Sequence, residues 1–252
     1  LMIGYQAQVL PAMFAAITLC YVEKFFNKRT PEVLKLVWVP FITLVVTGFL
    51  TILFIGPFAR TLGEMLTGFF AFLFKTPGLK YLGALLFGSL YAPLVITGLH
   101  HTFIAVDLQL TASTGGTFIW PMIAISNIAQ AGAVLATYFL YKSDKKQESV
   151  SMSGFVSAAF GITEPAMFGA NMKYMYPFYA ALIGSASGAL ICTAANVLAN
   201  GIGVGGVALA WLSIKPTSMV PFMLATLVAF GLAFGLTFVF SKTKLNKGSL
   251  TD

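Results

Sequence analysis

The strongest structural signal in the sequence is Leu36-Val-Trp-Val-Pro-Phe-Ile-Thr-Leu-Val-Val-Thr-Gly-Phe-Leu-Thr-Ile-Leu-Phe-Ile-Gly-Pro-Phe-Ala59. A helix needs about 20 mostly apolar residues to cross a bilayer, and this stretch exceeds that length. Hydrocarbon offers no partner for backbone N–H and C=O groups, so open strands are excluded and helices are expected. Five further stretches qualify or nearly qualify, at residues 3–22, 79–99, 118–141, 174–198 and 219–240. The sequence predicts an all-α polytopic membrane protein, a transmembrane helix bundle.

The composition supports this class. The 252 residues are 58% hydrophobic and 9% charged, whereas a soluble domain carries about 25% charged residues. The net charge of +7 reflects basic residues within 24–35, 142–146 and 242–247, each beside a long apolar run. This is the positive-inside pattern of membrane proteins, and it argues against nucleic acid as a partner. We therefore expect the lipid bilayer to be the main surrounding of the chain.

The cysteines and the first residues carry little chemistry. Cys20 and Cys192 both lie in apolar stretches, which supports neither a disulfide framework nor a metal cluster. We expect buried thiols without a chemical role, and we predict no metal and no cofactor. The chain starts at Leu1 within an apolar run that lacks the features of a signal peptide, so we expect a fragment or a processed subunit.

Residues 60–75 have the pattern of an amphipathic helix. Arg60, Glu64, Thr67 and Lys75 fall on one helical face, and apolar residues occupy the rest. The pattern predicts a helix lying at the membrane interface. The alternative is a helix that packs in the protein core and exposes one polar stripe to water.

Two stretches, at residues 100–116 and 154–172, are too short or too interrupted to cross a bilayer, and both are candidates for re-entrant hairpins. The basic loops at 24–35 and 142–146 should share one side of the membrane, yet simple crossings between them are odd in number. At least one apolar segment must therefore turn back. Irregular backbone at membrane depth is tolerated where protein or a water-filled cavity covers it, so these stretches are where we expect a solute site.

A glycine-rich run, Asn200-Gly-Ile-Gly-Val-Gly-Gly206, follows the fifth apolar stretch. It lacks the lysine and the strand–helix frame of a phosphate-binding loop, so a nucleotide site is not supported. We expect instead a tight turn at a hairpin tip, or a close approach of helices through small residues.

Ionisable residues away from the basic loops are the default candidates for a functional site. Such groups are expensive inside a bilayer and usually face a bundle interior or a water-filled path. If a helix continues past His100 and His101, Asp107 returns to the face of His100 after about two turns, where a carboxylate would fix the imidazole tautomer. The alternative is a histidine pair satisfied by backbone carbonyls at a helix end. The full set is His100, His101, Asp107, Glu164, Lys173 and Lys215.

Glu164 lies in Gly161-Ile-Thr-Glu-Pro165. Proline lacks an N–H and restricts the residue before it to extended geometry, so the carboxylate is expected at a break in the chain. Unwound backbone of this kind is a usual setting for solute recognition. The alternative is a helix-capping carboxylate worth about 1 kcal/mol. A functional role is favoured because a cap does not require a charge at membrane depth.

Two motifs, Gly98-Leu-His-His-Thr102 and Gly161-Ile-Thr-Glu-Pro-Ala-Met-Phe-Gly169, resemble the signature motifs of enzyme IIC proteins in the glucose superfamily of the phosphotransferase system. The resemblance covers nearly the whole chain and is of the sucrose/trehalose type. The first spans of a complete enzyme IIC and the enzyme IIB domain with its phosphorylated cysteine are not in this sequence. The stretches most similar to trehalose-specific members are Tyr91-Ala-Pro-Leu-Val-Ile-Thr-Gly-Leu-His-His-Thr102, Asp107-Leu-Gln-Leu110, Ser126-Asn-Ile-Ala-Gln130 and Ala199-Asn-Gly-Ile-Gly-Val-Gly-Gly206.

The resemblance implies a multi-pass protein of the bacterial inner membrane that imports a disaccharide. Phosphate from the enzyme IIB cysteine, supplied through enzyme IIA, would be transferred to the 6-hydroxyl of the sugar. Trehalose is the expected substrate, with sucrose or another disaccharide as the alternative. Residues 1–241 would form the membrane domain and 242–252 a polar cytoplasmic tail, and a homodimer is implied. Glu164 would correspond to the sugar-contacting glutamate, and the pair His100 and His101 to the family's histidine position.

The predicted site combines side chains that suit sugar hydroxyls. The amides among them could equally be hydrogen-bonded links between helices. We assign Glu164, His101 and His100 to catalysis, and these three together with Thr163, Asp107, Gln109, Asn127, Gln130, Asn171 and Lys173 to sugar binding.

Two other classes of function are considered from the residues alone. An ion- or proton-coupled transporter would also place His, Asp and Glu near the bilayer midplane beside broken helices. A purely structural membrane scaffold would have no reason to hold Glu164 and a histidine pair at depth. Dependence of uptake on a phosphoryl donor rather than on the proton gradient separates a phosphotransferase permease from the coupled transporter.

Overall fold

The computed structural model describes residues 9–243, apart from the side chains of residues 9, 10, 60, 63, 64, 66, 67, 70, 71, 75, 102, 105, 109, 112 and 113. Within this range the regular structure is helical, apart from two isolated β-bridges that join Ala199 to Thr117 and to Ile214. The predicted all-α polytopic class is confirmed, whereas the re-entrant hairpins stay a prediction. Helices long and apolar enough to cross a bilayer occupy Glu32–Ala59, Leu79–Ile96, Ile119–Leu140, Tyr176–Ala194 and Pro216–Ser241.

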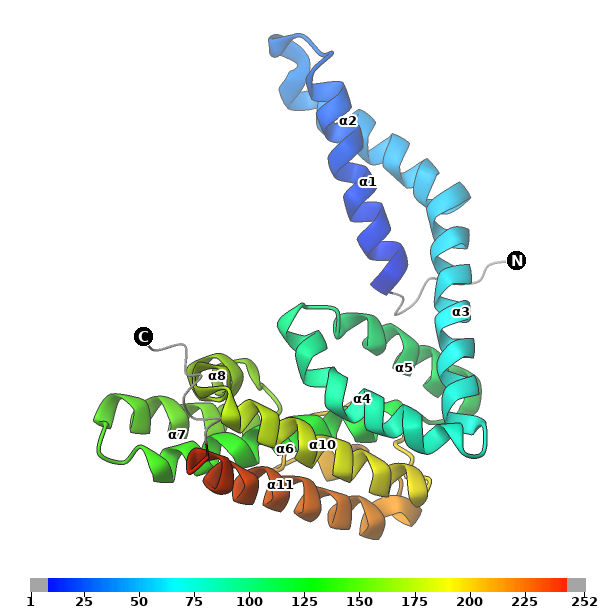
Figure 1. Cartoon of the computed structure of the whole chain (residues 1–252). Coiled ribbons are helices and arrows are strands. Elements are labelled where there is room, and N and C mark those ends of the chain that lie inside the picture. The colour runs from blue at the N-terminus through cyan, green and yellow to red at the C-terminus, as the bar shows by residue number, and fades with distance from the viewer. Residues whose placement is uncertain (1–8, 244–252) are drawn as a thin grey trace.

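The amino-terminal part of the chain forms an arm. Helices α1 (Val9–Asn27) and α2 (Glu32–Leu50) form a hairpin, and a π-helical turn, η1 (Thr51–Ile55), joins α2 directly to α3 (Gly56–Lys75). The arm rises from the body of the molecule, and α3 runs from the arm down to the body (Figure 1). The predicted span at residues 3–22 begins outside the described residues, and α1 ends later than expected.

The predicted helix at residues 60–75 exists, but it continues α2 and η1 without a loop. Pro57 lies in the first turn of α3, where a helix tolerates proline, and the π-helical turn accommodates the local change in hydrogen bonding. The four polar side chains that define the predicted wet face lie outside the described side chains. The interfacial position of this helix therefore stays a prediction.

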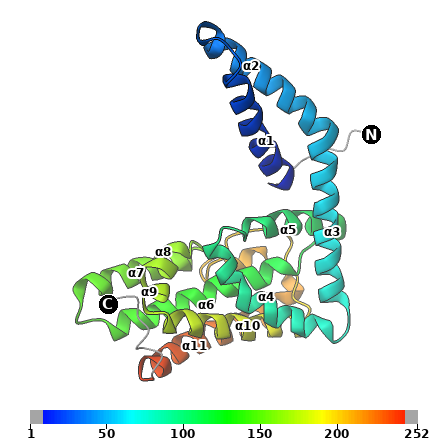
Figure 2. The ribbon, with the colours of Figure 1, turned by 45° about the horizontal axis from the view of Figure 1, so that its top comes forward.

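The body is a bundle centred on α6 (Ile119–Leu140), α10 (Tyr176–Ala194) and α11 (Met219–Ser241). These three helices pack against one another, while α4 (Leu79–Ile96) covers α10 and α7 (Lys145–Ala159) covers α6 (Figure 1 and Figure 2). Helix α6 is buried along most of its length, so it forms the centre of the body.

Small residues allow the central helices to approach closely. A Cβ on Gly184 of α10 would lie 2.5 Å from the carbonyl oxygen of Ala229, and a Cβ on Gly132 of α6 would lie 2.6 Å from that of Phe230. Neither distance is possible for a real side chain. Without a hydrophobic driving force between helices in lipid, this kind of close packing holds a membrane bundle together.

Short elements connect the long helices. Helix α5 follows α4, and a broken helical run follows α7. The chain between α10 and α11 is mostly irregular. The bounds are α5 His101–Thr114, α8 Glu164–Ala166, η2 Met167–Asn171, α9 Met172–Tyr174, η3 Ala210–Ser213 and η4 Pro216–Ser218.

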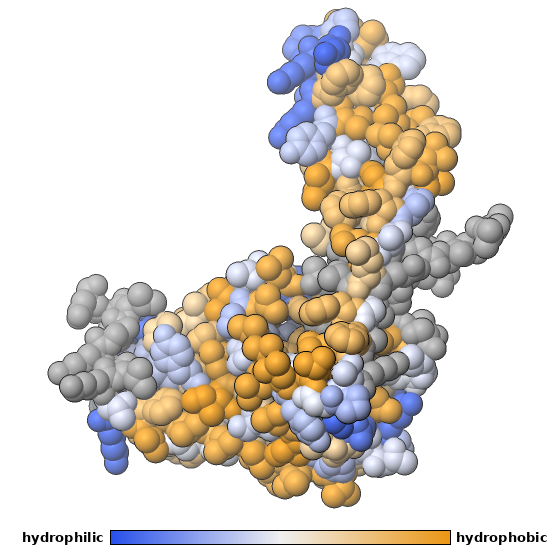
Figure 3. All heavy atoms as spheres, turned by 45° about the vertical axis from the view of Figure 1, so that its right-hand side comes forward, coloured by the Kyte–Doolittle hydropathy of each residue, from blue (hydrophilic) through white to orange (hydrophobic). Residues whose placement is uncertain are grey.

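Apolar side chains cover much of the outer surface (Figure 3). Leu36 and Val37 on the arm are 87% and 71% exposed, and Leu227 on α11 is 71% exposed. Hydrophilic residues gather at the tip of the arm, where the loop after α1 carries Lys28 and Arg29. Such a large apolar surface fits a protein whose outer face contacts lipid.

Cys192 is buried in α10, but Cys20 is exposed on α1. The prediction of two buried thiols is therefore wrong for Cys20. In the arm, α1 has few described helices around it, so the face that carries Cys20 remains uncovered.

Candidate functional site

A cavity of about 280 Å³ lies where α4, α5, α6 and two irregular segments meet. Among the predicted site residues whose side chains are described, four lie in this cavity, and they come from segments far apart in the chain. Convergent polar groups in an otherwise apolar cavity are typical of a small-molecule site. The lining residues are Tyr91 and Val95 of α4, His100 and Ile104 at α5, Trp120, Ile123 and Asn127 of α6, Phe160–Glu164 after α7, and Gly203, Val204 and Gly205 of the glycine-rich run.

The chain breaks immediately before Glu164. Gly161 adopts a left-handed conformation, with φ of 94°, and Thr163 is the N-cap of α8. Glu164 is the first residue of that helix, and Pro165 fits there because the first turn requires no N–H from it. The break therefore precedes Glu164, and the expectation of extended geometry at Glu164 itself is corrected.

The Glu164 side chain is exposed and lines the cavity. The N-cap of α8 is Thr163, whose side chain makes no cap hydrogen bond, and Glu164 lies in the first turn of that helix. Both roles considered for the Glu164 carboxylate, in sugar binding and at the helix end, therefore stay predictions. The salt bridges between described residues join Lys35 to Glu32 and Lys145 to Glu148, and neither involves Glu164. An ionised carboxylate in this position is a hydrogen-bond acceptor for a hydroxyl group.

His100 and His101 take different positions. His100 is the N-cap of α5, is half-buried and lines the cavity. His101 is exposed, and its ring contacts that of His100 in a tilted arrangement with centroids 4.0 Å apart. Burial lowers the pKa of His100, the charge of His101 lowers it further, and Glu164 opposes this shift. The neutral imidazole is therefore favoured at pH 7. The geometry favours His100 as the histidine that faces a ligand.

Asp107 does not form the expected pair with His100. Its side chain is fully buried, and its Oδ1 accepts a hydrogen bond from the Thr117 hydroxyl, while His100 Nδ1 has no described partner. Seven helical residues span about 10 Å along the axis, so the shared face alone does not bring the two side chains together. Burial raises the pKa of Asp107 to about 7, although the hydrogen bond from Thr117 acts in the opposite direction.

Three further predicted residues lie away from the cavity lining. The Nδ2 of Asn171 donates to the backbone oxygen and the Oε1 of Gln130, at 3.1 and 2.7 Å, and both residues are buried. This bond links η2 to α6, which is the alternative role considered for the amides. Lys173 Nζ donates to Gln147 Oε1 at 2.8 Å. The side chain of Gln109 lies outside the described side chains.

Aromatic residues form part of the cavity wall, and the sequence did not identify them as site residues. Tyr91 and Trp120 are only 5% and 7% exposed, and Phe160 lines the same cavity. An aromatic residue inside an apolar run has the same pattern as a core residue, which explains why it escapes detection. The available signal was the position of Tyr91 in the motif that ends in the two histidines.

The two irregular segments touch through glycine. A Cβ on Gly161 would lie 2.9 Å from the backbone nitrogen of Gly205 and 3.1 Å from that of Gly206. The N–H of Ala208 also donates to the carbonyl of Ala159 at 3.0 Å. The glycine-rich run thus makes a close backbone contact, but it joins two loops and not two helices as predicted.

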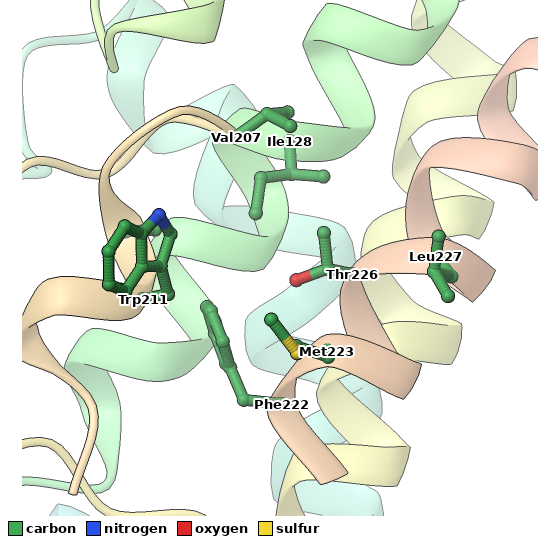
Figure 4. Close-up of a pocket in the computed structure, with 8 residues that line it drawn as sticks. Ile128, Val207, Trp211, Phe222, Met223, Thr226 and Leu227 are labelled. Carbon is green, nitrogen blue, oxygen red and sulfur yellow. The ribbon is translucent and has the colours of Figure 1, made fainter. Parts of the chain in front are cut away.

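A second cavity, of about 230 Å³, lies between α6, η3 and α11 (Figure 4). Thr226 supplies a hydroxyl group, and the other labelled side chains are apolar or aromatic. Such a lining offers few hydrogen bonds to a sugar, so the first cavity is the candidate site. Across the part of the chain that the structure describes, no three His, Cys, Asp or Glu side chains form a metal-binding group. The lining consists of Ile128, Val207, Ala210, Trp211, Phe222, Met223, Thr226 and Leu227.

Comparison with known proteins gives a consistent result. The family described as "Phosphotransferase system, EIIC" matches residues 1–185. The trehalose-specific EIIBC component of Escherichia coli (strain K12) is 43% identical over 248 residues, which cover 98% of this chain and 52% of that protein. The trehalose-specific EIIBC component of Bacillus subtilis (strain 168) is 45% identical over 206 residues, covering 81% of this chain and 43% of that protein.

A sucrose-specific EIIBC component, from Staphylococcus xylosus, is 44% identical over 208 residues, covering 81% of this chain and 43% of that protein. The chain thus spans about half the length of the curated relatives that it matches. No solved structure matches the chain. EIIC components are permeases of the bacterial inner membrane, and the long apolar helices agree with that location. On the match over residues 1–185 and these identities, the chain belongs to the EIIC family of the phosphotransferase system.

Proposed function

We propose that this chain forms the sugar-translocating part of a phosphotransferase-system permease that imports trehalose as trehalose 6-phosphate. The cavity between α4, α5, α6 and the two glycine-containing loops is the sugar site. The observation that carries this proposal is the convergence of His100, Asn127, Thr163 and Glu164 in one cavity. The similarity to two trehalose-specific components supports the choice of sugar.

The side chains of the cavity suit both binding and phosphoryl transfer. The Glu164 carboxylate accepts hydrogen bonds from sugar hydroxyls, and neutral His100 and the Asn127 amide can donate or accept. In the transfer step, the 6-hydroxyl oxygen attacks the phosphorus carried by a cysteine of enzyme IIB, and the S–P bond breaks to leave a thiolate. The hydroxyl proton passes to a base, for which Glu164 is our candidate. Phosphoryl transfer otherwise depends on positioning, which the cavity walls provide.

The proposal includes the partners of such a permease. Enzyme IIB donates the phosphoryl group and receives it from enzyme IIA, as the names of the EIIBC relatives and the family resemblance imply. We also expect a homodimer, with residues 1–241 as the membrane domain and 242–252 as a cytoplasmic tail.

The direct test is sugar phosphorylation by membranes that contain the full protein. With a phosphoryl donor and the soluble components of the system, trehalose should be converted to a sugar phosphate. Uptake into vesicles should need the donor and survive an uncoupler that collapses the proton gradient. Uptake that does not require the phosphoryl donor and is abolished by the uncoupler would instead identify an ion-coupled transporter.

Replacement of Glu164 by Gln tests the site within the same assay. Gln keeps the size of the side chain but removes its charge and basicity, so trehalose affinity should fall more than tenfold, or roughly 1.5–3 kcal/mol. The control is Glu148→Gln, which breaks the surface pair with Lys145 and should leave affinity unchanged. Wild-type binding and phosphorylation by Glu164→Gln protein would exclude Glu164 from the site.

A second candidate substrate is sucrose, because a sucrose-specific relative is 44% identical to this chain. Competition between the two sugars distinguishes the candidates. If sucrose is the substrate, unlabelled sucrose should block phosphorylation of labelled trehalose at far lower concentration than trehalose blocks that of sucrose.

A further inference from the structure

We propose that Asp107 acts through Thr117 as a positioning residue that holds three walls of the sugar cavity in register. This inference rests on the proposed function, because it assumes that the cavity binds a disaccharide. Asp107 itself is not among the cavity residues and is fully buried, so it has no described route to a bound sugar. Its role must therefore be carried by the residue that it contacts.

Thr117 is the contact of Asp107, and it is also fully buried. Its hydroxyl donates to Asp107 Oδ1 and accepts the backbone N–H of Ile119 at 3.0 Å. The pair thus fixes the start of α6 against the middle of α5. Because a hydroxyl can donate one hydrogen bond and accept another, Thr117 satisfies both neighbours at once.

The backbone of Thr117 holds a third segment. Its N–H donates to the carbonyl of Ala199 at 3.0 Å, and the N–H of Ala199 donates back at 2.8 Å. Ala199 also bridges to Ile214, which ties down the other end of the same irregular segment. The side chain and the backbone of one residue therefore join three separate parts of the chain.

Each joined part leads directly to a wall of the cavity. Helix α5 has His100 at its start, α6 carries Trp120 three residues after Thr117, and the segment that begins at Ala199 reaches Gly203 within four residues. A shift at Thr117 would consequently move all three walls. A displacement of a cavity wall by about 1 Å is enough to misalign the groups that position a bound sugar and so to weaken its binding.

Stability alone does not explain a buried carboxylate here. Asp107 Oδ2 is buried and has no described hydrogen-bond partner of good geometry, although the backbone N–H of Trp120 lies close enough to the carboxyl to lower its pKa. An unsatisfied buried polar atom is costly, and a well-packed apolar pair of the same shape is often at least as stable. The sequence nevertheless places a carboxyl group and a hydroxyl group at this junction, which fits a directional hydrogen bond used for positioning.

The test uses the full protein with three substitutions and trehalose binding by calorimetry. Thr117→Val removes the hydroxyl with little change of shape, and trehalose affinity should fall about tenfold. Thr117→Ser keeps the hydroxyl and should bind like the wild type. Asp107→Asn keeps an oxygen that accepts from Thr117, so it should stay within about twofold of the wild type. In the phosphorylation assay, Thr117→Val should raise KM and leave kcat nearly unchanged.

Thr137→Val is the matched control, because Thr137 is also a buried threonine, lies within α6 and donates to Ser151 Oγ at 3.0 Å, away from the cavity. It should lower the thermal midpoint without changing affinity. If Thr117→Val fails to fold, Asp107→Leu combined with Thr117→Val removes both polar partners, and this protein should fold but still bind weakly.

Three results would overturn the inference. Equal affinity losses in Thr117→Val and Thr137→Val would show a general effect on the fold. A loss in Asp107→Asn as large as that in Thr117→Val would show that the carboxylate charge matters directly. Wild-type affinity in the folded Thr117→Val protein would remove the junction from binding. These failures differ from failure of the proposed function, in which the unmodified protein binds and phosphorylates neither trehalose nor sucrose.

Discussion

His100 and His101 are neighbours in the chain, yet they lie in different surroundings. Adjacent helical residues point about 100° apart, so only one of two neighbours can face a narrow cavity well. His100 lines the cavity with a buried Nδ1, while His101 is exposed, does not line the cavity and contacts the ring of His100. The sequence predicted a functional pair without choosing between its members. The structure favours His100.

We predict that His100→Ala weakens trehalose binding about tenfold or more, because it removes a cavity group that hydrogen-bonds hydroxyls. His101→Ala should change affinity by less than about threefold and serves as the control. The comparison is made by calorimetry on folded proteins. Equal and mild losses of affinity in both variants would indicate that the two histidines only hydrogen-bond backbone carbonyls at a helix end.

The same residue gives the site a pH dependence. The pKa of His100 lies below its usual value because of burial and the neighbouring His101. If the neutral imidazole binds sugar, affinity should be steady at neutral pH and fall as the pH drops through this lowered pKa. The fall should be absent in His100→Ala.

Residues of the site differed in how readily the sequence revealed them. Glu164 and His100 stand out because ionisable groups are rare in apolar segments. Trp120 and Tyr91 do not, because an aromatic residue in a span is indistinguishable from packing until its neighbours are known. Asp107 stands out in the sequence for the same reason. Its partner Thr117 does not, because the two residues meet only through the turn of the chain between α5 and α6.

Among the elements, the long helices could be predicted from the length of the apolar stretches alone, whereas the positions at which helices break or continue could not. The sequence predicted a boundary between the span at 36–59 and the helix at 60–75, where the structure has a continuous run through η1. A π-helical turn has no apolar pattern of its own, so only the backbone reveals it. The segment before Glu164 was predictable as irregular because of Gly161 and Pro165, although the exact residue of the break was not.

The glycine-rich loop makes a prediction at this scale. A Cβ on Gly205 would lie 2.5 Å from Asn127 Nδ2, in the wall of the cavity, whereas a Cβ on Gly201 would meet only Thr111 at 3.8 Å. Gly205→Ala should therefore displace the Asn127 amide from the cavity and reduce trehalose affinity about tenfold, since one lost hydrogen bond costs about 1 kcal/mol. Gly201→Ala, in the same loop, should bind like the wild type. Similar binding by both variants would mean that the loop adjusts freely.

On the scale of the whole molecule, the arm and the body have separate roles in this account. Among the described side chains, those that line the candidate site come from α4 onward, and the arm formed by α1, α2 and α3 supplies none of them. The site residues predicted from the sequence likewise begin at His100, after these three helices. How the arm is oriented relative to the body could not be predicted, because the apolar surface of a lipid-facing helix carries no information about the direction of its neighbours.

The most direct measurement is a structure of the full protein determined with trehalose bound. The account predicts density for the disaccharide between α4, α5, α6 and the glycine-rich loop, with a sugar hydroxyl within hydrogen-bonding distance of Glu164 and His100. Density found only against the arm, or in the apolar cavity beside Trp211 and Phe222, would contradict it.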